Sequence, residues 1–136
     1  MTITERIANE IAVIFPDAVI YTENQDSGFE QPSFFIQKIL TATTPLLFEN
    51  QDRKYYYQIV YFPNLDHPNA DMERVEDKLL DNFTQLSGFA DIHNREFDID
   101  IANTVLEVKF EVWTWAIKQD TTIKQRKVDV NGGVKD

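Results

Sequence analysis

The chain has 136 residues, with thirteen basic and twenty-three acidic side chains, a net charge of -10 and no cysteine. Its length predicts a single domain, and the lack of cysteine excludes disulfides and cysteine-ligated zinc. The negative charge disfavours a free-standing nucleic-acid binder, because adhesion to phosphates depends on lysine and arginine.

The N-terminal segment predicts a helix rather than a targeting signal. It contains acids and lacks the apolar core of a signal peptide, and no apolar run of the chain is long enough to span a bilayer, so we expect synthesis in the cytoplasm. Thr2 and Glu5 have the spacing of a capping box, and isoleucines recur at helical intervals up to Phe15. Residues 18–23 predict a short strand, and residues 24–32 a loop.

Two strands with apolar residues on both faces form the centre of the predicted sheet. Residues 33–40, SFFIQKIL, and residues 53–63, RKYYYQIVYFP, are rich in aromatic and β-branched side chains. We expect them to pair as a hairpin. Because neither face of the second strand is plainly polar, each face requires a cover.

The connection between these two strands, residues 41–52, is long for a hairpin. It carries three consecutive apolar residues, Leu46, Leu47 and Phe48. These side chains either fold back onto the core of the domain or protrude as a contact for a partner.

A second helix and a final hairpin complete the domain. Asn69 is the expected cap of an amphipathic helix that ends near residues 87–88. Residues 96–101 predict a half-buried strand, and residues 104–117 predict the longest strand. Three side chains of the first of these strands are expected to face inward: Phe97, Ile99 and Ile101.

The predicted element order is α-β-β-β-α-β-β, which indicates an α+β fold with a mainly antiparallel sheet of about five strands and two helices. We expect this domain to span residues 1–118, followed by a polar, mobile C-terminal tail or arm over residues 119–136. Two helices can cover one face of the sheet. The second apolar face then meets other copies of the chain, unless one helix lies on each face.

The chain has few residues suited to catalysis. It has two histidines: His67 lies in a predicted turn, and His93 precedes a strand. His93 with Asp91, Asp98 and Asp100 is the alternative reading as a metal or small-ligand site, although the spacing is that of no known metal motif. Phosphate-binding and hydrolase motifs are missing from the sequence. We therefore expect no enzymatic activity, no cofactor and no metal.

Several segments together resemble a known family. They are FPDAVIYTE, QPSFFI, YYYQIVYFP, ADMERVEDKLLDNF and VLEVKFEVW. In order, spacing and hydrophobic pattern, roughly residues 2–118 resemble the small tail terminator proteins of long-tailed phages and prophages of Gram-positive bacteria. QPSFF and YYYQIVYFP are the closest local matches.

The resemblance implies a structural protein of the virion. Proteins of this family form a ring, typically of six subunits, at the head-proximal end of the tail tube, where they stop tube polymerisation and present the surface that joins the capsid. The implied partners are other copies of the chain, the tail-tube protein and the head–tail connector, while DNA passes without specific binding and no membrane is involved. A head completion or adaptor protein of the connector is the alternative within the virion.

Ring assembly assigns roles to three groups of residues. The subunit-interface candidates are Trp113, Trp115, Ile117, Tyr55 and Tyr57. Leu46, Leu47 and Phe48 are the candidates for docking on the tube or the next ring. Four acidic residues either line a lumen that repels DNA or form an outer solvated face: Asp98, Asp100, Glu107 and Glu111.

Overall fold

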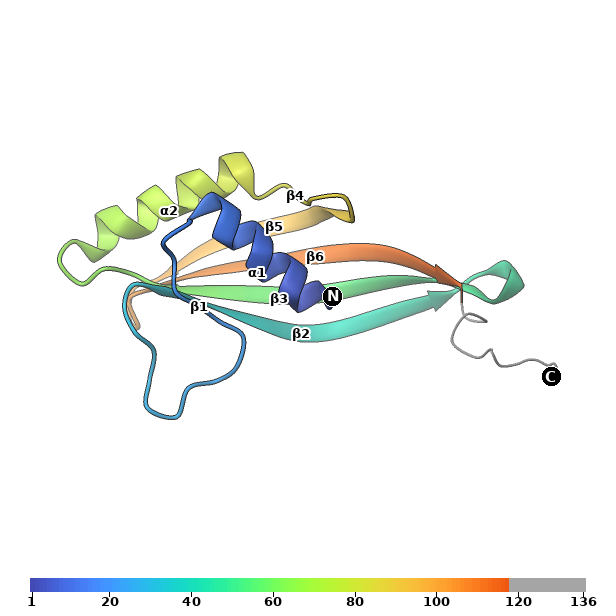
Figure 1. Ribbon diagram of the computed structural model, residues 1–136, viewed down its shortest axis with the longest axis horizontal. Coiled ribbons are helices and arrows are strands. Elements are labelled where there is room, and N and C mark those ends of the chain that lie inside the picture. Colours follow the sequence, from blue (N-terminus) through green and yellow to red (C-terminus); the bar gives the residue numbers. More distant parts are fainter. Residues whose placement is uncertain (118–136) are drawn as a thin grey trace. The chain divides into compact units, whose positions relative to one another are not determined.

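The computed structural model describes residues 1–117. The chain divides into two compact units: unit 1 comprises Met1–Leu40 and Tyr55–Val112, and unit 2 comprises Thr41–Lys54 and the chain from Trp113 onward. The elements, shown in Figure 1, are α1 (Ile3–Ile14), β1 (Ile20–Tyr21), β2 (Ser33–Pro45), the 3-10 turn η1 (Leu47–Glu49), β3 (Asn50–Phe62), α2 (Pro68–Asn82), β4 (Gln85–Leu86), β5 (Ala90–Asp100) and β6 (Val105–Ile117). The predicted tail, residues 119–136, lies outside the described residues.

The strands form one six-stranded sheet in the order β1-β2-β3-β6-β5-β4. It is mostly antiparallel, with β1 pairing parallel to β2. Together with the two helices, this confirms the predicted α+β class. The additional strand is β4, a two-residue element that pairs with β5.

Helix α1 begins as the sequence predicts. The Thr2 hydroxyl accepts a hydrogen bond from the Glu5 backbone N–H at 3.1 Å, and the Glu5 carboxylate accepts one from the Thr2 N–H at 2.7 Å. These bonds satisfy two donors that a helix start leaves free, and the bond from the Thr2 N–H to the carboxylate lowers the pKa of Glu5. The buried stripe consists of Ile7, Ile11 and Ile14.

Helix α2 differs from its prediction at both ends. It starts at Pro68 with His67 as the N-cap residue, so the assignment of Asn69 as the cap was wrong. Proline fits the first helical position, because its missing N–H has no partner there. The helix also ends at Asn82 and not near residues 87–88, because the chain turns into β4.

The central hairpin is longer than predicted. Strand β2 continues to Pro45 and β3 begins at Asn50, so the long connection expected over residues 41–52 was wrong. Threonine favours strands, which accounts for the continuation of β2 through Thr44. The turn itself places Phe48 at φ 60 and Glu49 at φ 63.

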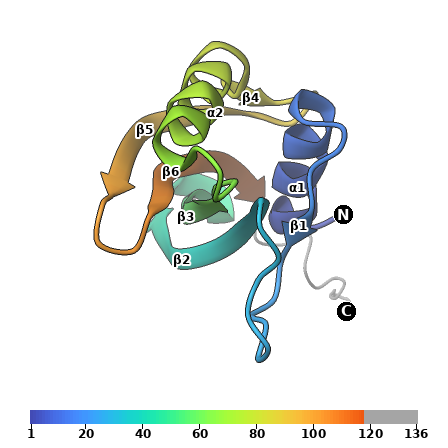
Figure 2. The same cartoon turned by 90° about the vertical axis from the view of Figure 1, so that its left-hand side faces the viewer.

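Both helices cover the same face of the sheet in unit 1 (Figure 2). Their buried stripes pack on alternate residues of β2, β3 and β6, which we call the inner face. The core includes Phe34 and Ile36 from β2, Tyr57, Ile59 and Tyr61 from β3, and Leu106, Val108, Phe110 and Val112 from β6. The arrangement with one helix on each face is therefore excluded.

The opposite side of the sheet, the outer face, has a small core of its own. Phe29 lies in the loop between β1 and β2, where Gly28 adopts a φ of +89°. The Phe29 ring centroid is 4.8 Å from that of Phe35 and 4.7 Å from that of Phe62. The expectation that this face has no cover within the chain was thus wrong at this end of the sheet, where a loop supplies the cover.

The last hairpin pairs β5 with β6 in a register interrupted by a bulge between His93 and Glu96. Within it Asn94 has a φ of 54. Strand β5 begins at Ala90, so His93 lies in a strand and not in the predicted loop. The inward placement of Ile101 was also wrong, since it lies in the turn after β5 and is 86% exposed.

Candidate functional site

The predicted acidic residues gather on the outer face of β5 and β6. Asp98 lies opposite Glu107 in the register, and Asp100 opposite Val105. Like charges directly opposite each other on a sheet are destabilising, so this face carries an electrostatic cost. Lys109 lies opposite Glu96 in the register on the same face, and its positive charge offsets part of the negative charge.

Two of these acids also receive hydrogen bonds. The Asn103 side chain and backbone both donate to the Asp100 carboxylate, and these bonds hold the pKa of Asp100 below its ordinary value. The Asn94 side chain donates to Glu111 at 3.0 Å, which ties the bulge of β5 to β6. Asp100 is therefore ionised throughout the physiological pH range.

The two tryptophans on β6 are exposed. Trp113 is 39% and Trp115 59% exposed. The ammonium of Lys54 lies 4.7 Å from the centroid of the Trp113 ring, a cation–π contact within unit 2. Ile117 ends β6. The two tryptophans alternate along the strand, so their side chains point to the same side.

The two candidate tyrosines lie on the inner face of unit 1. Tyr57 is 2% exposed, and its hydroxyl is 2.9 Å from that of Thr4 at the start of α1. Burial raises the pKa of Tyr57. Tyr55 is half-buried against the same core, with the Lys38 ammonium 5.3 Å from its ring centroid. Tyr57 is thus a core residue in the isolated chain, and Tyr55 lies at the margin of that core.

The tip of the β2–β3 hairpin exposes its apolar residues. Leu46 is 41%, Leu47 78% and Phe48 87% exposed. Phe48 and the following Glu49 both occupy the left-handed region, which is unfavourable for residues other than glycine. These side chains are therefore exposed at the tip, and their contact with a partner stays a prediction.

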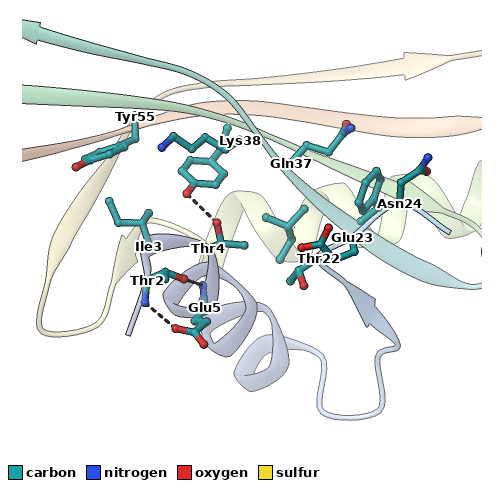
Figure 3. A pocket seen from close by; sticks show the side chains of 13 residues that line it. Thr2, Ile3, Thr4, Glu5, Thr22, Glu23, Asn24, Gln37, Lys38 and Tyr55 are labelled. Atoms are coloured by element: carbon teal, nitrogen blue, oxygen red, sulfur yellow. Dashed lines mark hydrogen bonds between the residues drawn. The ribbon is translucent and has the colours of Figure 1, made fainter.

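A groove lies beside β2 where β1 stops (Figure 3). β1 pairs with Phe34 and Phe35 alone, so among the described residues the edge of β2 has no strand partner from Ile36 onward. The groove measures about 760 Å³. It is lined by Thr2, Ile3, Thr4, Glu5, Thr22, Glu23, Asn24, Phe35, Ile36, Gln37, Lys38, Tyr55 and Tyr57.

A comparison with protein families decides the identity of the fold. A family model described as "Phage tail terminator protein" matches residues 2–124, which is most of the chain. The chain belongs to the phage tail terminator family. The protein is therefore a structural component of the phage tail in the virion. A search of curated proteins gives no match.

The alternative histidine site receives no geometric support in this family member. His93 lies opposite Glu111, on the far side of the bulge from Asp98 and Asp100. Within residues 1–117, no three histidine, aspartate or glutamate side chains are grouped so that they could hold a metal ion. No helix in the same range is long and apolar enough to cross a membrane.

The sequence pattern missed the groove and the cover over the outer face of this terminator. Residues 18–23 predict a strand long enough to protect more of β2, but the paired part is only Ile20–Tyr21. Phe29 lies in a loop without periodicity. The sequence shows only an aromatic residue next to a glycine in a polar segment, and this pattern does not predict which residues the Phe29 ring contacts.

Proposed function

We propose that this protein forms a ring, typically of six subunits, that caps the head-proximal end of the tail tube. The ring stops tube polymerisation and presents the surface that joins the head. Its partners are other copies of itself, the tail-tube protein and the head–tail connector, and DNA passes through it without specific binding. One observation carries the proposal: Trp113 and Trp115 are exposed side by side on one strand of a tail terminator family member.

The tryptophans suit a subunit contact. Interface cores are enriched in aromatic residues and depleted of charge, and tryptophan is among the residues that contribute most to binding. Each indole also carries an N–H that finds a partner readily at a partly polar boundary. Lys54 over the Trp113 ring keeps this side chain in a defined orientation before assembly.

The hairpin tip supplies a second contact, to the tube or to the connector. Leu47 and Phe48 are the most exposed large apolar side chains of this segment. Residues in sparsely populated backbone regions cluster at recognition sites, and Phe48 and Glu49 both have a positive φ.

The acidic outer face of β5 and β6 suits the lining of a DNA channel. Carboxylates repel phosphates, so DNA slides past such a surface without adhering. Asp98 and Glu107 lie directly opposite each other although this pairing costs stability. Like charges that lie opposite each other despite this cost favour the lumen over an ordinary solvated face.

Assembly can be tested by native mass spectrometry and light scattering over a concentration series. We expect the wild-type chain to form a closed oligomer, and the pair Trp113→Ser and Trp115→Ser to shift it to monomer while circular dichroism stays unchanged. Ile101→Ser is the matched control, since Ile101 is 86% exposed but lies in a turn of unit 1. A wild-type chain that stays monomeric at every concentration, also with tail tubes present, would contradict the ring.

The role within the virion can be tested by deleting the gene. A terminator controls tube length, so its loss should give tails of uncontrolled length in electron micrographs. A head completion protein would instead leave tails of normal length that fail to join heads. Complementation with the Trp113→Ser and Trp115→Ser variant should reproduce the deletion, whereas Ile101→Ser should restore normal tails.

A further inference from the structure

The edge of β2 beside the groove is a strand edge without the usual protection. Strand edges expose backbone N–H and C=O groups that readily pair with another chain, and proteins normally shield them. Past Phe35 this edge has no described partner, and Ile39 and Leu40 are each 55% exposed. The only charge along it in unit 1 is Lys38, whose ammonium lies over the Tyr55 ring. An extended segment can therefore add to β2 here.

The groove specifies the chemistry of that segment. Its lining includes the apolar or aromatic side chains of Ile36, Tyr55 and Tyr57. Glu5 and Glu23 contribute carboxylates and Lys38 contributes an ammonium (Figure 3). The bond from the Thr2 N–H lowers the pKa of Glu5, so this group is ionised. The volume of about 760 Å³ is within the range of binding sites, roughly 300–1,000 Å³. The occupant should be extended, partly apolar and basic.

The chain itself contains such a segment, residues 121–130, TTIKQRKVDV. Half of its residues are β-branched, and Lys124, Arg126 and Lys127 make it basic. Residues 118–136 carry five basic and three acidic side chains, whereas residues 1–117 carry eight and twenty. The segment and the groove are thus complementary in charge as well as in strand preference.

We propose that residues 121–130 of one copy add as a strand to the β2 edge of the neighbouring copy, in the groove between β2, the start of α1 and residues 22–24. This inference rests on the proposed ring. Only residues 116–120 separate Trp115 from the segment in the sequence, so a subunit contact at the tryptophans brings it close to the next subunit. The backbone then supplies the hydrogen bonds and Glu5 and Glu23 select the basic residues.

Cross-linking tests the proposal directly, because the native chain has no cysteine. One full-length population carries Lys38→Cys in the groove, and the other carries Gln125→Cys in the segment. After mixing and assembly, a short bismaleimide should join the two populations, as identified by mass. The linker tolerates a shift of the segment along the strand. Asp81→Cys, exposed on α2, replaces Lys38→Cys in the control and should give little product.

A charge reversal tests the selectivity of the groove. Glu23→Arg should lower the yield of the cross-link several-fold, whereas Asp26→Arg, in the same loop but outside the groove lining, should leave it unchanged. The yield should also fall with rising salt, because exposed charges are screened.

Native mass spectrometry of the same samples separates the possible failures. Rings that cross-link no better through Lys38→Cys than through Asp81→Cys overturn the strand addition and leave the ring intact. A third sample carries Lys38→Cys and Gln125→Cys in the same chain. If a cross-link forms in this sample only, and within one chain, the neighbouring copy does not donate the segment. A chain that remains monomeric overturns the strand addition together with the proposed function.

Discussion

The two faces of the sheet in unit 1 are covered in different ways. On the inner face, α1 and α2 bury side chains from β2, β3, β5 and β6 in one continuous core. On the outer face, a loop places the single ring of Phe29 over Phe35, Val60 and Phe62 at one end, while β5 and β6 carry acidic residues and Ile39 of β2 is exposed. An apolar strand face therefore does not by itself require a partner, because a short loop can cover it.

This comparison reduces the number of apolar residues that suggest a contact between subunits. The apolar content of β3 on its two faces is accounted for within the chain, by the helices on one side and by Phe29 on the other. Exposed large apolar residues remain in both units: the hairpin tip and the tryptophans at the end of β6 in unit 2, and Ile39 and Leu40 of β2 in unit 1. Substitutions at four places probe the contrast, and we order them by their expected effect on stability.

The largest loss is expected at the inner face. Phe83 is fully buried after α2, and its ring meets that of Phe110 edge to face at 5.1 Å. Phe83→Ala leaves a cavity and should reduce the free energy of unfolding by about 3–5 kcal/mol, measured by urea denaturation. Leu80→Ala, on the more exposed side of the same helix, should change it by less than about 0.5 kcal/mol. Equal losses in the two variants would contradict the assignment of the core.

The second-largest loss of stability is expected at Asp71, a polar residue beside the inner face. Asp71 accepts hydrogen bonds from the Tyr61 hydroxyl at 2.6 Å and the Asn64 N–H at 2.9 Å, and it pairs with Arg74 at 2.8 Å. Burial acts to raise the pKa of Asp71, but these three partners outweigh it and lower the pKa below the ordinary 3.8. Burial and the neighbouring Asp71 together raise the pKa of Tyr61.

Because the folded-state pKa of Asp71 is the lower one, its contribution is present above the unfolded value of 3.8 and is lost as the pH falls through the folded value. Asp71→Asn should cost about 1–3 kcal/mol at pH 7. The difference in urea midpoint between wild type and variant should shrink as the pH falls below about 4. Asp77→Asn, exposed on the same helix, should behave like wild type.

A smaller loss is expected at the outer face. Phe29→Ala removes a half-buried ring and should cost about 1–2 kcal/mol, since full burial of such a side chain contributes roughly 1.5–3 kcal/mol. Glu30→Ala, exposed beside it, should have no measurable effect on urea unfolding. A loss at Phe29 as large as that at Phe83 would mean that the loop belongs to the main core.

The smallest effect on the folded monomer is expected at the tryptophans. Trp115→Ser, at a side chain that is 59% exposed, should change the free energy of unfolding by less than about 0.5 kcal/mol. Trp113→Ser should cost about 0.5–1 kcal/mol, because it also removes the Lys54 contact. Thermal unfolding of dilute monomer checks both values, and a loss of several kcal/mol would place these rings in a core.

Periodicity was sufficient wherever side chains repeat against a continuous core. The capping box at Thr2, the isoleucine stripe of α1 and the alternation along β6 all follow from local rules, and so does the α+β class. The exposed tryptophans were also recognisable, since they break the charged alternation of β6. Local patterns failed where contacts between distant segments decide the structure.

Three failures illustrate this. Leu86 continues the helical spacing of α2, yet it is buried as part of strand β4. No local sequence pattern predicts that β4 pairs with β5. Phe29 is buried by a fold of the loop onto the sheet. The open edge of β2 depends on where β1 leaves it, which is set by the path of the chain and not by residue type.

The bulge in β5 decides which side chains of this strand reach each face. Ile92 and Phe97 both pack with the inner core although an odd number of positions separates them, which a regular strand forbids. The extra residue between His93 and Glu96 shifts the alternation by one and brings Arg95 to the end of α2, where its guanidinium donates to the carbonyls of Leu79, Leu80 and Phe83. Without this extra residue, β5 could not both bury Ile92 on the inner face and place its acidic residues on the outer face. A single inserted residue therefore sets both the apolar side and the charged side of the strand.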